Sequence, residues 1–359
     1  MLTSQQIESP LALFLDARIA RIAVLASGWE TTVFEFVLSS PSGRFPAMPV
    51  GQPLVLRFYQ STDAAEKGAR EYLTMDRISA AGIAVPRPYA FVEDPEAIGA
   101  PFLVMQRLEG GPLFSTRSFP QAFKTFSLAF FSFVQTQARI HRLDPMAPGL
   151  RDIPRTSARP GDGDMPLLDR LLRIIDERVE QGPLPGLRNA LHRLTTRAPQ
   201  FHDEKKSIVH MDYHPQNAIV AGFKVTGIID WVKSDVGDRH LDAATTAVIL
   251  SSSAMEHPRW MRDNVIGNSL RMSFSALYLP LYHAMAPMDF ERFRYCQAVA
   301  AVLRLSMLGM MSAQGAETVG FRPEAISEVT PGVVRLLSRY ATRKSGTAAR
   351  VDLARPRIA

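Results

Sequence analysis

Three oxygen-bearing side chains near the middle of the chain have a spacing that constrains both the fold and the chemistry. Asp212 follows a short apolar run, Asn217 comes five residues later across a Pro, and Asp230 lies thirteen residues beyond Asn217. The apolar residues between the last two turn at Gly222, which predicts a β-hairpin that begins at Asn217 and brings Asp230 back beside it. Phosphoryl transfer from a nucleotide needs a carboxylate beside the attacking hydroxyl and oxygen ligands for Mg²⁺. The joint spacing predicts such a site, although an isolated Asp in a loop is more often a turn or cap residue.

Length and composition leave room for an enzyme with two lobes. A chain of 359 residues can bury two cores, and 46% hydrophobic with 21% charged residues is ordinary for a globular protein. The single cysteine, Cys296, excludes an intrachain disulfide framework, and its apolar surroundings predict a buried structural thiol in a reducing compartment. The N-terminus has no signal-peptide pattern, and no uncharged stretch approaches the roughly 20 apolar residues of a spanning helix. We therefore expect a cytoplasmic protein with no membrane span.

Most of the net charge of +6 lies at the C-terminus. Residues 340–359 carry five basic side chains and one acid, Asp352, so they contribute +4 and leave the rest of the chain nearly neutral. Together with the small residues and Pro356, this predicts a basic, disordered tail over residues 338–359. A solvated tail is the main expectation and a weak contact with an anionic surface the alternative. No nucleic-acid partner is expected.

The central motifs resemble those of the aminoglycoside phosphotransferase family, which also includes choline, sugar and homoserine kinases. The catalytic loop of that family usually reads His-Gly-Asp-x-His-Pro-x-Asn, and the matching residues here are His210, Asp212, His214, Pro215 and Asn217. Met211 replaces the usual Gly. The metal motif of the family is matched by Ile229-Asp230-Trp231. Its next signature, Gly-Asp-Pro-x-x-Asp, is matched at residues 237–242, with Arg239 in place of Pro.

The resemblance implies an α+β, bilobal, protein-kinase-like fold. Residues 1–107 would form the nucleotide-binding lobe, with a five-stranded antiparallel sheet and one main helix. Residues 108–337 would form a mainly helical catalytic and acceptor-binding lobe with an insertion at about 145–206. The sequence pattern predicts strands at 22–25, 32–38, 54–59 and 102–105, and helices at about 9–20, 64–81, 123–141, 167–181 and 187–196.

The same resemblance assigns roles to the residues of the catalytic loop. Asp212 would accept the hydrogen bond of the substrate hydroxyl and take its proton, and Asn217 and Asp230 would bind Mg²⁺. We expect His210 to brace the loop rather than to act as a base. For His214, a contact with the transferred phosphoryl group and a scaffolding role stay equally open.

Arg57 lies where the family places its phosphate-binding Lys. A guanidinium stays charged and can bridge a phosphate oxygen and a carboxylate, so the replacement is chemically workable. Glu71 on the following helix is its expected partner, with Glu66 as the second choice, and an ordinary surface ion pair is the alternative.

The rest of the nucleotide site is expected at a loop and at the hinge between the lobes. The loop that covers the phosphates contains only one glycine, so cradling by backbone amides is limited, and hydroxyls or amides of Ser27, Gly28 and Thr31 are the candidates. Backbone groups at the hinge would bind the base, around Met105, Gln106 and Leu108. ATP is the expected donor and GTP the alternative.

A small-molecule hydroxyl is the expected acceptor. Between His240 and Tyr340 eight acids face nine bases, which argues against a strongly cationic acceptor. The apolar segment 273–287 either lines a pocket or packs as a helix core, the second being favoured. A protein kinase is disfavoured because Ile-Asp-Trp stands in place of Asp-Phe-Gly and no Ala-Pro-Glu follows. A catalytically silent nucleotide-binding or scaffold protein is the other alternative. The oligomeric state is not predicted.

Overall fold

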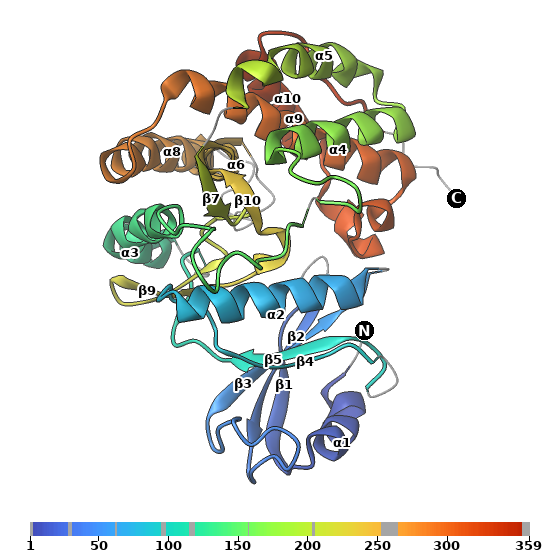
Figure 1. Cartoon of the computed structure of the whole chain (residues 1–359), viewed down its shortest axis with the longest axis vertical. Coiled ribbons are helices and arrows are strands. Elements are labelled where there is room, and N and C mark those ends of the chain that lie inside the picture. The colour runs from blue at the N-terminus through green and yellow to red at the C-terminus, as the bar shows by residue number, and fades with distance from the viewer. Residues whose placement is uncertain are drawn as a thin grey trace.

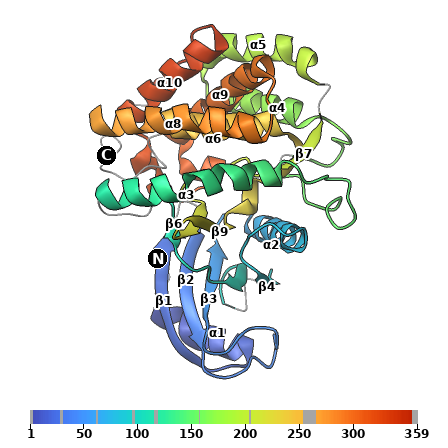
Figure 2. The same ribbon diagram turned by 90° about the vertical axis from the view of Figure 1, so that its left-hand side faces the viewer.

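The computed structural model shows two lobes with the helix Ala64–Ala80 between them (Figures 1 and 2). It describes residues 3–27, 31–61, 63–94, 98–114, 119–156, 158–202, 205–252 and 265–353. The N-terminal lobe is built on a sheet and the C-terminal lobe is mainly helical, as the sequence predicts.

The N-terminal lobe contains a five-stranded sheet of order β1-β2-β3-β5-β4, in which every neighbouring pair is antiparallel. Its strands are β1 (Ile19–Ser27), β2 (Thr31–Leu38), β3 (Pro53–Tyr59), β4 (Pro88–Val92) and β5 (Phe102–Gln106). Helix α1 (Ser4–Leu15) covers one face of the sheet and α2 (Ala64–Ala80) lies against the other.

The side chains of strand β3 alternate between the two faces of the sheet. Its alternate side chains Leu54, Leu56 and Phe58 join the core beneath α1, whereas Val55 and Tyr59 point to the α2 side. Arg57 has the same parity as Val55 and Tyr59, so the alternation of the strand places the only charge of β3 on the α2 side.

The first helix starts earlier than its apolar spacing suggests. A helix was expected over 9–20, but α1 begins at Ser4 because Thr3 and Gln6 form a reciprocal capping box. The helix ends where Asp16 adopts a left-handed conformation with φ 48°, and β1 begins three residues later.

The C-terminal lobe surrounds helix α9 (Phe290–Gln314). The other long helices are α3 (Phe119–Ile140), α4 (Leu167–Gln181), α5 (Arg188–Arg197), α6 (Arg239–Ser252), α8 (Val265–Met285) and α10 (Pro331–Ser345). Helix α9 is long and apolar enough to span a membrane, but 83% of its most apolar window is buried among the other helices. It therefore has the burial of a core helix, and Cys296 lies within it, buried as predicted.

The C-terminal lobe also contains five short strands. They are β6 (Gly111–Pro112), β7 (Lys206–Val209), β8 (Ala218–Ala221), β9 (Lys224–Ile228) and β10 (Asp235–Asp238). β7 pairs with β10, and β8 pairs with both β6 and β9. The hairpin predicted after Asn217 is therefore present as β8 and β9.

The expected disordered tail is not observed as far as Leu353. The expected boundary at residue 338 falls inside α10, whose Thr330 cap and left-handed Gly346 define its two ends. Beyond the helix, Ala349 and Val351 are buried, and the amide of Arg350 donates to the carbonyl of Gly186. The basic residues misled the prediction because they alternate with apolar side chains that pack on the lobe. Residues 354–359 lie outside the described part.

Candidate active site

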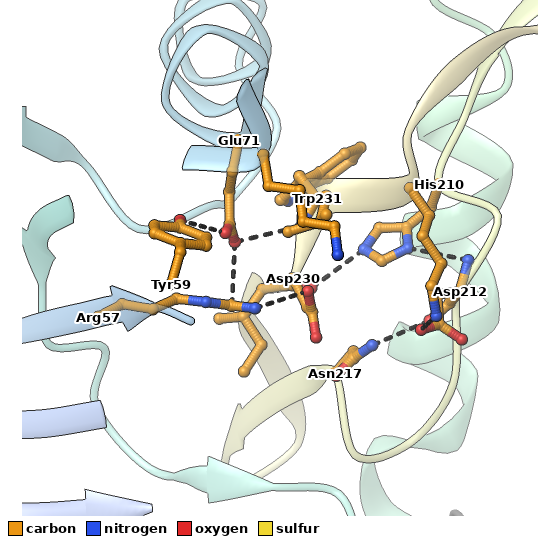
Figure 3. A network of polar contacts seen from close by, with 12 residues as sticks. Arg57, Tyr59, Glu71, His210, Asp212, Asn217, Asp230 and Trp231 are labelled. Carbon is orange, nitrogen blue, oxygen red and sulfur yellow. Dashed lines mark hydrogen bonds and ion pairs between the residues drawn. The ribbon is translucent and has the colours of Figure 1, made fainter. Parts of the chain in front are cut away.

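The catalytic loop runs from the end of β7 to the start of β8. Because β7 pairs with β10 and β8 pairs with β9, both ends of the loop are anchored in sheets. The amide of Ile229 donates to the carbonyl of Asn217 at 2.9 Å, which fixes the residue before Asp230 to the end of the loop. The hairpin thus brings the three predicted residues to one region (Figure 3).

His210 is buried, and its two ring nitrogens contact the hairpin and the loop respectively. Nε2 lies 3.0 Å from the carbonyl of Ile229, and Nδ1 accepts from the amide of Asp212 at 3.3 Å. These partners require the neutral tautomer with its proton on Nε2. His210 therefore links the loop to the end of the hairpin.

A buried polar network lies beneath the loop and centres on Asp242 of α6. Its carboxylate accepts from the amide of Met211 at 2.6 Å, from Nε2 of His141 at 2.8 Å and from Gln137 at 3.1 Å. The other nitrogen of His141 lies 2.5 Å from the hydroxyl of Tyr282. Burial acts to raise the pKa of Asp242, but its hydrogen bonds and the nearby histidines lower it overall. Asp242, the last residue of the Gly-Asp-x-x-x-Asp signature, therefore fixes the backbone of the loop at Met211.

The backbone of Met211 adopts a conformation that glycine enters more easily than other residues. Its φ is 60°, in the left-handed region that a non-glycine residue enters at a cost of about 1–2 kcal/mol. In this conformation its amide donates to Asp242 at 2.6 Å.

Asp212 is held by two cations of the C-terminal lobe. Nζ of Lys233 lies 2.8 Å from one carboxylate oxygen, and a guanidinium nitrogen of Arg304 lies 3.8 Å from the other. Burial favours the neutral acid, but the charges of Lys233 and Arg304 outweigh it and hold the pKa of Asp212 well below its usual range. Asp212 is therefore ionised at neutral pH and can accept a hydrogen bond from a hydroxyl.

Asn217 and Asp230 each have a side-chain oxygen that could bind a cation. The side-chain amide nitrogen of Asn217 donates to the carbonyl of Asp212 at 3.0 Å, so its oxygen is the atom that remains for a cation. Asp230 has a left-handed φ of 66°, and 35% of its side chain is exposed. An amide and a carboxylate oxygen fit Mg²⁺, which is bound in phosphotransferases by one or two side chains together with phosphate oxygens. Among the described residues no cluster of three or more His, Cys, Asp or Glu side chains forms an all-protein metal cage.

Arg57 joins the two lobes through a chain of ion pairs. One guanidinium nitrogen lies 3.1 Å from Glu71 of α2, and another lies 2.9 Å from Asp230. Glu71 is fully buried and also accepts from the hydroxyl of Tyr59 at 2.6 Å and from the amide of Trp231 at 3.3 Å. Burial lowers the pKa of Arg57, but the charges of Asp230 and Glu71 more than reverse this and keep it charged. Glu71 is thus the partner that the structure provides for Arg57.

The second predicted partner, Glu66, lies elsewhere. It pairs with Arg70 one helical turn away, and 70% of its side chain is exposed. This pair is a surface contact of the kind that contributes little to stability.

His214 lies inside the loop, where it is nearly fully buried. Its Nε2 is 3.2 Å from the side-chain nitrogen of Asn217 and 3.8 Å from a carboxylate oxygen of Asp212. Burial lowers the pKa of His214 to about 4, against the opposing effect of Asp212. A neutral ring between the proposed base and a proposed metal ligand favours scaffolding over a charged phosphate contact.

The predicted phosphate-covering loop is only partly described. Ser27 ends β1 and pairs with Thr32, Thr31 begins β2 and is buried, and Gly28 lies outside the described residues. A segment of the C-terminal lobe reaches this point, because Arg322 donates to the carbonyl of Thr31 and to the hydroxyl of Thr32.

The hinge residues follow β5. Met105 is buried between β3 and β4, and the amide of Gln106 donates to the carbonyl of Arg87 at 2.8 Å. Leu108 is buried against Gly227, where a Cβ atom would meet its side chain at 2.5 Å. The hinge therefore packs directly against the hairpin that carries Asp230.

Sequence reasoning missed three cations of the site. Lys233 lies only three residues beyond Asp230, so proximity to the metal motif was an available signal. Arg304 and Arg322 come from far along the chain, in α9 and just before a 3-10 segment (Pro323–Glu328), and no local pattern distinguishes them.

Two animal proteins match this chain over part of their length. A Gallus gallus protein named acyl-CoA dehydrogenase family member 11 is 26% identical over 182 residues, which cover 50% of this chain and 22% of that protein. A Mus musculus protein named acyl-CoA dehydrogenase family member 10 is 24% identical over 277 residues, covering 72% of this chain and 25% of that protein. The chain thus spans about a quarter of the length of these curated relatives.

Solved phosphotransferases share the fold. A ternary complex of a thermostable mutant of aminoglycoside phosphotransferase APH(4)-Ia with AMP-PNP and hygromycin B has a TM-score of 0.57 and 16% identity, covering 88% of this chain and 97% of that one. Macrolide 2'-phosphotransferase type I has a TM-score of 0.54 and 13% identity, covering 98% of this chain and all of the other.

The family model described as the phosphotransferase enzyme family (APH) matches residues 21–288, which include the five-stranded sheet from Arg21 onward, the loop that carries Asp212 and Asn217, and the motif around Asp230, but not α9 or α10. With the bilobal fold and the convergence of Asp212, Asn217 and Asp230, this match shows that the chain belongs to the phosphotransferase enzyme family.

Proposed function

We propose that this protein is a Mg²⁺-dependent phosphotransferase that moves the γ-phosphate of ATP to a hydroxyl of a small molecule. The observation that carries the proposal is the convergence on one hairpin and one loop of an ionised Asp212, the oxygens of Asn217 and Asp230, and the Arg57–Glu71 pair. Family membership supports the reaction class. The nucleotide analogue and the antibiotic bound to APH(4)-Ia support a nucleotide donor and a small-molecule acceptor.

The proposed chemistry begins at Asp212. Its carboxylate accepts a hydrogen bond from the acceptor hydroxyl and orients the oxygen in line with the γ-phosphorus. The new O–P bond forms as the bond from the γ-phosphorus to the bridging oxygen breaks, which releases the nucleoside diphosphate. The hydroxyl proton passes to Asp212 late in the reaction and then to solvent. Bound Mg²⁺ would neutralise charge on the phosphates, held by Asn217 and Asp230.

Arg57 has to change partners when the nucleotide binds. In the structure it pairs with Asp230, the residue proposed to bind the metal, at 2.9 Å. Since Glu71 alone can neutralise the guanidinium, a metal at Asp230 would free one fork of Arg57 for a phosphate oxygen. Met105, Gln106 and Leu108 would contact the base through backbone groups, with ATP as the donor and GTP as the alternative.

Two other functions make different predictions. A catalytically silent nucleotide-binding protein would bind ATP but transfer phosphate to no acceptor. A protein kinase would phosphorylate polypeptides. The placement of the Asp212 carboxylate beside the proposed metal ligands Asn217 and Asp230 favours catalysis, because passive nucleotide binding needs no hydroxyl-binding carboxylate there.

The test is a transfer assay with both donors. Purified protein is incubated with Mg²⁺ and ATP or GTP against a panel of sugars, amino alcohols, hydroxy acids, macrolides and aminoglycosides, and phosphorylated products are identified by mass spectrometry. We expect transfer to at least one hydroxyl compound, and loss of transfer with retained nucleotide binding in Asp212→Asn. Nucleotide binding with no transfer to any compound would select the silent alternative.

A further inference from the structure

A cavity of about 210 Å³ lies next to Asp212 in the C-terminal lobe. It is enclosed by α4, α9, the catalytic loop at Met211 and the residue Lys233 that follows the metal motif. Two of its lining residues, Lys233 and Arg304, contact the carboxylate of Asp212 directly. A hydroxyl that reaches Asp212 from this cavity would therefore belong to a molecule that occupies it.

The polar part of the lining is predominantly cationic. Arg178, Lys233 and Arg304 line the cavity, whereas Asp235 is the one carboxylate among its described lining residues. Asp235 is buried and accepts from both terminal nitrogens of Arg170, at 2.9 and 3.3 Å, so its negative charge is balanced by that of Arg170. The cavity therefore has an excess of positive charge close to the proposed base.

Two of the three cations, Arg178 and Arg304, are poorly hydrated. Burial lowers the pKa of Arg178 to about 10, against the opposing charge of Glu177, and lowers that of Arg304 against the charge of Asp212, so the surroundings disfavour their charged forms. Arg178 donates to the carbonyl of Leu303 at 3.3 Å. An anion in the cavity would relieve this cost, and a cation would increase it.

The remaining wall is apolar. Its side chains come from two facing helices and the loop: Leu167, Leu171, Ile174, Leu303, Met307 and Met211. An acceptor that fills the cavity thus needs an apolar body as well as a charge. The segment 273–287 packs in the core, as the sequence favoured over a pocket lining, since Phe274, Tyr278 and Tyr282 are buried.

We propose that the acceptor is a hydroxylated carboxylic acid with an apolar body, whose carboxylate binds Lys233, Arg304 and Arg178 while its hydroxyl binds Asp212. This substrate class rests on the proposed phosphotransferase function. The incoming carboxylate takes over Lys233 from Asp212, which frees the Oδ2 atom of Asp212 to accept the hydrogen bond of the hydroxyl. A neutral acceptor lacks this exchange, and an amino alcohol would place a second positive charge beside the three cations.

The first experiment compares acceptors of equal size. Aliphatic hydroxy acids of four to eight carbons, their methyl esters and the corresponding amino alcohols are assayed with Mg²⁺ and ATP. We expect kcat/KM for the acids to exceed that of the esters by about tenfold or more, and that of the amino alcohols by about 100-fold. Phosphorylation of esters or amino alcohols in preference to acids would overturn the substrate class while leaving the phosphotransferase function intact.

The second experiment uses Arg178, which does not contact Asp212. Arg178→Met is expected to raise KM for the hydroxy acid about tenfold and to leave KM for ATP unchanged, and Arg178→Lys should recover most of the loss. Arg188→Met is the matched control, because Arg188 pairs with Glu180 on the surface. Equal losses in the Arg178 and Arg188 variants would contradict the proposal.

A direct binding measurement tests the proposed acceptor site separately from the phosphotransferase function. Isothermal titration with the same hydroxy acids, without nucleotide, should show saturable binding to the wild-type protein and binding at least fivefold weaker to Arg178→Met. Binding without turnover would support the site and contradict the phosphotransferase function. Transfer to other hydroxyl compounds without any binding of the acids would do the reverse, and absence of both would overturn both.

Discussion

Two carboxylates of the site, Asp230 and Asp212, have lowered pKa values but are held from opposite lobes. Asp230 pairs with Arg57 of the N-terminal sheet, which Glu71 positions from α2. Asp212 pairs with Lys233 and Arg304, which both belong to the C-terminal lobe. The first arrangement depends on how the lobes meet, and the second is internal to one lobe. The proposed nucleotide side therefore depends on the placement of the two lobes, whereas the proposed acceptor side depends on the packing of α9 against the loop that carries Asp212.

The largest effect is expected at the proposed base. Asp212→Asn removes the charge that accepts the hydroxyl proton, so kcat should fall by about 10³-fold or more, with ATP affinity changed by less than about twofold. Transfer assays and nucleotide titration measure the two quantities. Retention of more than a tenth of the activity would show that Asp212 does not play this role.

The hydrogen bonds that Asp242 accepts beneath the loop should contribute to the free energy of unfolding. Asp242→Asn weakens three buried hydrogen bonds and turns one amide group toward the donor of Met211, so the free energy of unfolding at pH 7 should fall by about 3 kcal/mol. The folded-state pKa of Asp242 is lowered, so its stabilisation is present above its unfolded value of about 4 and is lost as the pH falls through the folded value. Urea titrations at pH 7 and at acid pH should therefore show a smaller difference between the two proteins in acid.

An exposed carboxylate provides the control for this prediction. Asp352→Asn changes the same chemical group on the surface and should alter the unfolding free energy by less than about 0.5 kcal/mol. A difference between wild type and Asp242→Asn that stays constant with pH would mean that the buried network does not depend on the charge of Asp242.

The link between the lobes is tested at Arg57. Arg57→Ala should lower kcat/KM for the nucleotide by about 10²-fold, because it removes the phosphate contact and leaves Glu71 buried without its cation. Arg57→Lys keeps one charge but loses the fork, so an intermediate loss is expected. Steady-state kinetics with circular dichroism as a folding check makes the measurement, and unchanged kinetics in Arg57→Ala would remove Arg57 from the site.

Lys233→Met should reduce activity less than Arg57→Ala does, and it should affect the kinetics of the acceptor rather than those of the nucleotide. We expect kcat/KM for the acceptor to fall about tenfold and KM for ATP to stay within about twofold, since Lys233 contacts Asp212 and the cavity. Kinetics with each substrate varied in turn distinguishes the two parameters. A change confined to the nucleotide KM would place Lys233 at the phosphates and contradict its assignment to the acceptor side.

The smallest effect is expected at Met211. Met211→Gly relieves a left-handed backbone strain of about 1–2 kcal/mol but adds chain entropy and removes apolar contacts, so the unfolding free energy should change by less than about 1 kcal/mol. Thermal unfolding measures this. A loss of several kcal/mol would show that the side chain matters more to packing than the backbone strain does.

Local sequence patterns predicted much of the fold. Helix α4 has the bounds that its spacing indicates, and β2, β3 and β5 differ from their predicted bounds by at most one residue at either end. Their signals are periodic and lie within the segment itself. The errors occurred where a local signal competed with a remote one: a capping box at Thr3 outweighed apolar spacing, and contacts with Gly186 order a tail that composition marks as disordered.

The sequence by itself determined the three oxygen-bearing residues, because Asp212, Asn217 and Asp230 lie on one loop and one hairpin whose geometry follows from nearby residues. It also indicated the Arg57–Glu71 pair, since strand and helix are consecutive. Only the tertiary structure decided which cations surround Asp212 and what lines the cavity beside it. Arg304 comes from α9, almost a hundred residues beyond Asp212, and a contact over that separation depends on how a whole lobe packs.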